Sequence, residues 1–290
     1  MDMPIQGVGP PLVTPFETNG DINHDALREL VNRLEAAGVD FLVPCGSTSE
    51  AELMTASERR SVIETVAAAA TVPVLAGTGQ PGLRETTQAT AAAATAGADA
   101  ALVVTPFYYT HSQATFRSYY RDLADRASIP VYLYSVPAYT DVALTAATVG
   151  ALAEHSNIVG IKDSAGDLGR LVRTVEQTTD AAFDVLVGSA SVFTQALAIG
   201  AVGGVMALAN LAPTALATIA DTQPTDPEHA RRQNAELVAL NRAITSEYGP
   251  SGLKWAMRQR GLPAGTPRSP HTALSSDGQA TIGSLLDRLD

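Results

Sequence analysis

Short apolar runs alternate with longer amphipathic segments along roughly the first 220 residues. The apolar runs have the length of strands and are followed by turn residues, whereas the longer segments are rich in alanine and have helical spacing. Eight such strand–helix units predict an α/β fold, and their repeat is typical of a parallel (β/α)8 TIM barrel. The predicted strands cover residues 8–13, 41–45, 74–76, 101–104, 131–134, 158–161, 185–187 and 204–206.

After residue 222 the strand pattern stops, and three further helical segments are expected. We therefore predict a catalytic barrel over residues 1–222 and a C-terminal helical extension over residues 223–290. No dinucleotide-binding fingerprint follows the first strand, which disfavours a doubly wound sheet. The predicted C-terminal helices cover residues 228–247, 251–260 and 281–289, and helix starts are expected at Asn23 (or Asp21), Thr55, Thr145 and Asp167.

Residues 185–220 contain no charged side chain, so a membrane span has to be considered there. Glycines and Pro213 divide this run into pieces the length of strands and helices, and buried strands with covering helices are the better interpretation. The N-terminus has no basic region before an apolar run, and the single Cys45 cannot form an intrachain disulfide. These observations predict a cytoplasmic protein.

The composition argues against anionic partners. The chain has 30 acidic and 19 basic residues, a net charge of −11, which disfavours nucleic acid and membrane surfaces as partners. Acid excess with few lysines is typical of a halophilic protein, although a merely acidic mesophilic protein has the same composition.

Lys162 is one of only two lysines, and it ends the apolar strand 158–161. An ammonium group at that place loses hydration, so its pKa falls and the neutral amine can attack a carbonyl to form a Schiff base. The alternative is an ordinary strand-end lysine that reaches solvent.

Other strand ends carry hydroxyl groups that could meet Lys162. Ser47 and Thr48 follow the second strand, Tyr108 and Tyr109 follow the fourth, and Tyr134 ends the fifth. In a barrel the loops after the strands share one face, so these groups could form a single polar pocket. Taken singly, Tyr134 could be a core tyrosine, and Ser47 and Thr48 could be turn residues.

Five segments together resemble the dihydrodipicolinate synthase / N-acetylneuraminate lyase superfamily of Schiff-base-forming class I aldolases. The resemblance covers essentially the whole chain and implies a TIM barrel with a helical extension. The segments are Thr14-Pro15-Phe16, Gly46-Ser47-Thr48-Ser49-Glu50, Tyr134-Ser135-Val136-Pro137, Gly160-Ile161-Lys162-Asp163 and Gly188-Ser189.

The resemblance implies a role for each matching residue. Lys162 would form the Schiff base with a 2-oxo acid such as pyruvate, and Tyr134 would be the general acid/base. Thr48 and Tyr108 would extend a proton relay, with Tyr108 crossing from a neighbouring subunit of a homotetramer. No cofactor and no metal would be required. The expected substrate-binding residues are Ser47, Thr48, Tyr139, Gly188, Ser189 and Val205.

Three departures from the family pattern concern the substrate. Tyr139 stands where the synthases usually carry an arginine for the carboxylate of aspartate semialdehyde, and Ser47 and Ser49 replace a usual threonine and glycine. A tyrosine cannot form a bidentate charged pair with a carboxylate. We therefore predict an aldolase that cleaves 2-keto-3-deoxygluconate or its 6-phosphate to pyruvate and an aldehyde. Alternatives are a 2-keto-3-deoxy sugar acid dehydratase, a dihydrodipicolinate synthase, or a catalytically silent barrel.

The remaining candidates are interpreted as structural. The five histidines are scattered without the spacing of metal ligands, and Cys45 is expected to be a buried, inert thiol. Glu50 and Asp163 are expected at a helix start or in ion pairs, and Arg268 is expected to be structural.

Overall fold

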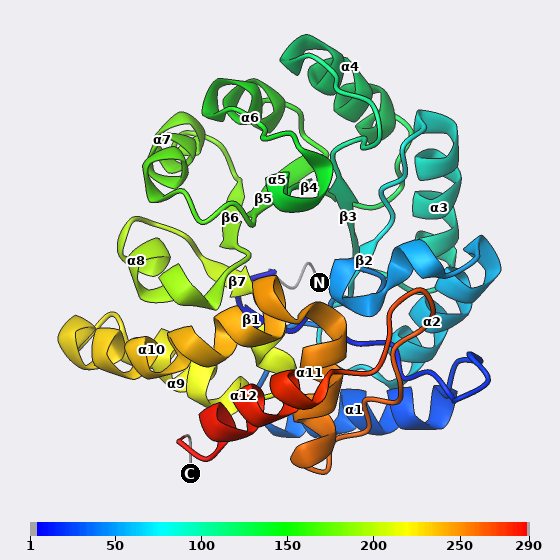
Figure 1. Cartoon of the computed structure of the whole chain (residues 1–290). Helices are drawn as coiled ribbons and strands as arrows, with labels where there is room; N and C mark the ends of the chain where they lie inside the picture. Colours follow the sequence, from blue (N-terminus) through cyan, green and yellow to red (C-terminus); the bar gives the residue numbers. More distant parts are fainter. Residues whose placement is uncertain (1–4, 289–290) are drawn as a thin grey trace.

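The computed structural model describes residues 5–288 and contains a parallel sheet of seven strands in the order β1-β7-β6-β5-β4-β3-β2. Figure 1 shows these strands around the centre of the molecule, with most helices outside them. This arrangement confirms the predicted α/β class and parallel pairing. The strands are β1 Gly7–Gly9, β2 Leu75–Gly77, β3 Ala100–Val104, β4 Val131–Ser135, β5 Ile158–Asp163, β6 Asp184–Val187 and β7 Gly203–Val205.

The predicted second strand, residues 41–45, is not a regular strand. It makes isolated parallel bridges between Pro11 and Val43 and between Leu42 and Val74, so it lies between β1 and β2. Pro44 has no N–H to donate, and Cys45 has a φ of 59°, outside the extended region. The Pro44 carbonyl still accepts from Gly77 N at 2.9 Å, so the pairing ends at Cys45, and the predicted strand is present as two isolated bridges instead of a regular strand.

The helices around the sheet begin where capping residues predict. Asn23, Thr55, Thr145 and Asp167 are each observed as an N-cap whose side chain accepts a backbone N–H. Thr55 also forms the expected capping box with Glu58. The helices are α1 His24–Ala36, α2 Ala56–Ala69, α3 Leu83–Thr95, α4 Gln113–Ala124, α5 Pro137–Thr140, α6 Ala146–Ala153, α7 Leu168–Thr178, α8 Phe193–Ala198 and α9 Pro213–Thr222.

Side chains of the strands alternate between two cores. On β4, Val131 and Leu133 join the large core between sheet and helices, whereas Tyr132 and Tyr134 join a smaller inner cluster. This alternation follows from the two-residue period of a strand. The inner cluster is formed by Ile5, Phe41, Val43, Leu75, Ala100, Leu102, Tyr132, Tyr134, Val136, Leu186 and Val205.

An irregularity between β4 and β5 sets the direction of Lys162. Val131 pairs with Ile158, but its neighbour Tyr132 pairs with Gly160, so β5 gains one residue. A bulge of this kind reverses which side chains face the interior beyond it. Lys162 consequently lies opposite Tyr134, one of the inner tyrosines.

The C-terminal helices pack on one side of the strands, near α1, as Figure 1 shows in orange and red. They are α10 Pro227–Arg242, a π-helical turn Ala243–Glu247, α11 Gly249–Gln259 and α12 Ser276–Leu286. The last helix begins five residues before the predicted 281, because Ser275 caps it. The uncharged run 185–220 is divided among β6, α8, β7 and α9, and within residues 5–288 no helix is long and apolar enough to cross a membrane.

Candidate functional site

Lys162 lies on the inner side of the curled sheet, close to the carboxyl end of β5. Its register partners are Tyr134 on β4 and Leu186 on β6, and only 5% of the residue is exposed. The Nζ atom lies 4.3 Å from the centre of the Tyr134 ring. Burial lowers the pKa of Lys162 to about 7, so a large share of the amine is neutral at neutral pH. A neutral amine in a dry site is the form that attacks a ketone.

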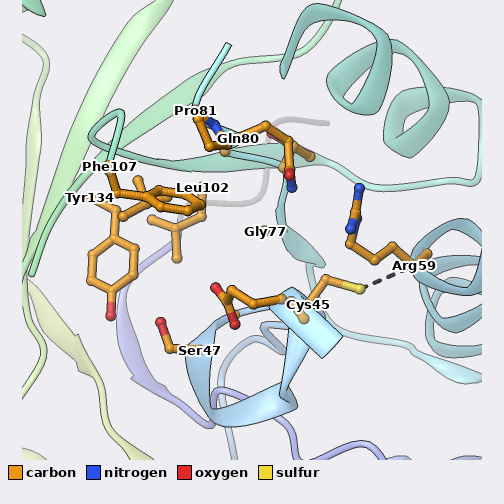
Figure 2. A pocket seen from close by; sticks show the side chains of 15 residues that line it. Cys45, Ser47, Arg59, Gly77, Gln80, Pro81, Leu102, Phe107 and Tyr134 are labelled. Carbon is orange, nitrogen blue, oxygen red and sulfur yellow. Dashed lines mark hydrogen bonds between the residues drawn. The ribbon is translucent and has the colours of Figure 1, made fainter. Parts of the chain in front are cut away.

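Tyr134 keeps its proton in this environment. Burial raises the pKa of its phenol, and hydrogen bonding with the hydroxyls of Ser47 and Ser164 works in the opposite direction. Figure 2 shows the Tyr134 and Ser47 hydroxyls pointing toward one another. A protonated phenol next to an amine can donate a proton to an oxygen that leaves as water. Ser164 was not predicted as a site residue, although its place two residues after Lys162 could have indicated it.

The loop after residue 45 is a tight turn built from its own side chains. Ser47–Ser49 is a 3-10 helix, and the Ser49 hydroxyl donates to Leu12 O at 2.5 Å and accepts from Gly46 N at 3.1 Å. Ser49 is therefore used for the loop itself and is fully buried. Ser47 and Thr48 are half-buried beside it.

Two neighbouring cavities open around this loop, with volumes of about 240 and 270 Å³. Both include Ser47, Glu52 and Phe107 in their linings; the first extends to Tyr134, as Figure 2 shows, and the second to Tyr139. The second is also lined by Pro250 and His271 of the C-terminal part. The cavities form two lobes of one site, and sequence patterns did not indicate Glu52, Phe107 or His271 as part of it. Neither Lys162 nor Thr48 is among the described residues lining either lobe; Lys162 is next to the first lobe through Tyr134, whose ring centre lies 4.3 Å from its Nζ atom.

Tyr108 and Tyr109, which follow the fourth predicted strand, do not line these lobes. Tyr108 is 87% exposed, has a φ of 80° and contacts the ring of Tyr109 edge-on at 5.0 Å. Within one chain it is not placed beside Tyr134, so the relay role of Tyr108 stays a prediction that needs a second subunit. Tyr139 is 65% exposed at the mouth of the second lobe.

The predicted residues after β6 and on β7 have packing contacts in this chain. A Cβ on Gly188 would overlap the Ser164 side chain, so glycine lets the two loops approach each other. The Ser189 side chain caps the short 3-10 helix Ala190–Val192, and Val205 is fully buried in the inner cluster. Their roles in substrate binding stay predictions.

The charged residues next to the loop and the lysine are paired. Asp163 accepts two hydrogen bonds from the Arg170 guanidinium, at 3.0 and 2.9 Å, so the expected ion pair is confirmed.

Cys45 is buried, and burial raises the pKa of its thiol to about 12, as expected for an inert cysteine. Among residues 5–288 no group of three His, Cys, Asp or Glu side chains is placed to hold a metal ion.

Comparison with known proteins identifies relatives along the full length. The model of the dihydrodipicolinate synthetase family matches residues 4–289. A 4-hydroxy-tetrahydrodipicolinate synthase of Methanothrix thermoacetophila is 36% identical over 285 residues, which cover 98% of this chain and 97% of the relative. The enzyme of the same name from Haloarcula marismortui is 37% identical, with 98% and 94% covered. The crystal structure of a dihydrodipicolinate synthase from Acinetobacter baumannii complexed with pyruvate has a TM-score of 0.94 and 32% identity, with 98% and 99% covered.

The predicted cleavage of a 2-keto-3-deoxy sugar acid is wrong. Full-length relatives are named as synthases, and similar solved structures are too. The prediction depended on Tyr139, Ser47 and Ser49. The Ser49 hydroxyl is bonded to backbone, and Ser49 lines neither cavity, whereas Ser47 lines both and keeps the hydroxyl that a threonine would supply. Tyr139 lies exposed beside the second lobe, whereas Lys162 and Tyr134 are buried on the inner side of the curled sheet. The chain belongs to the dihydrodipicolinate synthetase family, whose members are pyruvate-dependent carbon–carbon lyases of the class I aldolase type.

Proposed function

We propose that this enzyme condenses pyruvate with aspartate semialdehyde to give 4-hydroxy-tetrahydrodipicolinate, as the names of its relatives indicate. The observation that carries the proposal is the buried Lys162 amine, with a pKa of about 7, 4.3 Å from the ring of Tyr134. We also propose a closed eight-membered barrel, in which residues 40–45 take the place of the missing strand between β1 and β2.

The first half of the reaction uses the amine and the phenol. Neutral Lys162 adds to the C2 ketone of pyruvate, and the carbinolamine expels water when Tyr134 donates a proton to its hydroxyl. The iminium ion withdraws electrons, so C3 gives a proton back to the Tyr134 phenolate and becomes the nucleophilic carbon of an enamine. Ser47 and Thr48 would hold the pyruvate carboxylate from the rim of the pocket.

The second half forms the carbon–carbon bond. The enamine attacks the aldehyde carbon of the semialdehyde, and Tyr134 protonates the new alkoxide. The amino group of the same molecule then attacks the iminium carbon and displaces Lys162, which closes the ring and regenerates the free amine. The larger second substrate would occupy the lobe lined by Tyr139 and Phe107.

We propose that the enzyme works as an oligomer in which Tyr108 of one subunit completes the site of another, the homotetramer being the expected form. The exposed, backbone-strained Tyr108 supports this proposal, because an exposed aromatic pair is typical of an interface. The net charge of −11 supports activity at high salt, which we propose as the working condition.

The proposed reaction is tested by incubating the protein with pyruvate and aspartate semialdehyde at low and at high salt. Mass spectrometry then follows the consumption of the two substrates, the product and the pyruvate adduct of the protein. We expect a product with the atoms of both substrates less one water, and none with Lys162→Ala. Formation of a pyruvate adduct without consumption of the semialdehyde would reject this second substrate and leave the Schiff-base chemistry standing.

A further inference from the structure

The second lysine of the chain is buried against the loop that carries Ser47 and Thr48. Lys254 lies on α11 and has no exposed surface. Its Nζ atom lies 2.5 Å from Glu50 Oε1, and it donates to Thr14 O at 2.7 Å and to Thr266 O at 2.8 Å. Two backbone oxygens thus accept hydrogen bonds from the ammonium group, and the Glu50 carboxylate supplies the opposite charge. Pairing of this kind is required for a charge without contact to water.

Glu50 is held from both sides by the C-terminal part of the chain. Its other oxygen, Oε2, accepts from Arg268 N at 2.8 Å and lies 3.0 Å from His271 Nδ1. Glu50 itself is buried, with no exposed side chain. The carboxylate therefore connects a barrel loop with two separate segments of the helical extension.

The backbone of Glu50 explains why this anchoring matters for the site. Glu50 has a φ of 57°, in the left-handed region that non-glycine residues rarely adopt, and it ends the 3-10 turn of Ser47. Its N–H donates to Ser47 O at 3.1 Å. Because surrounding contacts must hold such a conformation, the ion pair to Lys254 fixes the turn and with it the Ser47 hydroxyl near Tyr134.

We infer that Lys254 is a positioning residue that acts through Glu50 on the pyruvate-binding turn, so that the helical extension is part of the catalytic apparatus. Lys254 is not among the residues that line the two lobes, and its amine is held by Glu50 and two backbone oxygens, so it does not replace Lys162. The inference rests on the proposed pyruvate site. It states that an ion pair outside that site controls how well the turn binds the substrate carboxylate.

The inference is tested with Lys254→Met, Glu50→Gln and the double variant. We expect each single variant to raise the KM for pyruvate at least tenfold, while borohydride at saturating pyruvate still modifies Lys162 completely. The double variant is expected to be no worse than the worse single variant, because both changes remove the same contact. Glu50→Gln keeps the side-chain shape. If Lys254→Met does not fold, the KM of Glu50→Gln for pyruvate tests the inference alone.

A surface ion pair of the same extension is the matched control. Arg232 and Glu228 on α10 lie 2.7 Å apart with exposed side chains, so Arg232→Met and Glu228→Gln should leave the KM unchanged. The inference is overturned if the Lys254 and Glu50 variants melt at lower temperature with an unchanged KM per folded molecule, or if their effects on KM multiply. Absence of any pyruvate adduct in the wild-type protein would instead reject the proposed function.

Discussion

The ring of Tyr132 occupies the space that a side chain at Gly160 would need: a Cβ built on Gly160 would lie 2.3 Å from Tyr132 Cε1. The two residues are register partners immediately after the irregularity between β4 and β5. The contact therefore helps to fix the irregular pairing of β4 and β5. That pairing directs Lys162, two residues further along β5, toward the inner side of the sheet.

Gly160→Ala tests this relationship. The added methyl group must displace the Tyr132 ring or the backbone of β5, and we expect a loss of about 1–3 kcal/mol in the free energy of unfolding. The rate at which borohydride traps pyruvate should fall as well, because Lys162 shifts with the strand. Gly283→Ala on α12 is the control, since 3.8 Å separates its Cβ from Trp255 and a helical alanine is stabilising. Equal urea-unfolding curves for wild type and Gly160→Ala would contradict the packing described.

The pKa of Lys162 predicts the pH dependence of Schiff-base formation. Because burial lowers this pKa from the ordinary 10.5 to about 7, the reactive neutral form disappears as pH falls below about 7. The second-order rate of adduct formation with pyruvate should rise about tenfold per pH unit below 7 and level off above it. A rate that keeps rising to pH 10 would indicate an amine exposed to solvent. Stopped-flow measurement followed by borohydride quenching gives the profile.

Tyr134→Phe removes the proton donor and keeps the ring that packs beside Lys162. General acid/base groups contribute about 10²–10⁴-fold, so kcat should fall by that range while the protein remains folded. Adduct formation should slow, since the carbinolamine loses water without a positioned acid. Tyr120→Phe is the control: its buried hydroxyl bonds backbone at Val103 and Tyr134 and lines neither lobe, so its loss should lower stability and change kcat far less than Tyr134→Phe does. A fully active Tyr134→Phe enzyme would remove Tyr134 from the mechanism.

Tyr139→Arg tests whether the residue at the entrance of the second lobe binds the carboxylate of the second substrate. Tyr139 takes the position of an arginine in the resembling synthases, and an arginine there could pair bidentately with the semialdehyde carboxylate. We expect the KM for aspartate semialdehyde to fall about tenfold and the KM for pyruvate to stay constant. Val238→Arg, at an exposed position of α10 that lines neither lobe, controls for added charge. An unchanged KM for the semialdehyde would place its carboxylate elsewhere.

Much of the fold could be predicted because its signals are local. Periodicity located the strands, and short polar side chains at Asn23, Thr55 and Asp167 marked helix starts that the structure confirms. The segment 41–45 was predicted only in part, because its apolar pattern is that of a strand, whereas Pro44 lacks an N–H to donate and the positive φ of Cys45 ends the pairing.

The site was predictable only in part, for a physical reason. Lys162 and Tyr134 are recognisable from strand ends, but their mutual distance depends on the irregular pairing of Val131 and Tyr132, which no pattern encodes. The link from Lys254 to Glu50 spans 204 positions of sequence and could not be seen from either residue alone.

The measurement that tests the central claim most directly is peptide mapping after reduction of the protein–pyruvate mixture with borohydride. The chain has only two lysines, so the assignment between them is unambiguous. We predict one reduced pyruvyl group per chain on the peptide containing Lys162, none on the peptide containing Lys254, and no adduct in Lys162→Ala. A protein that turns over pyruvate while Lys162 stays unmodified would contradict the account.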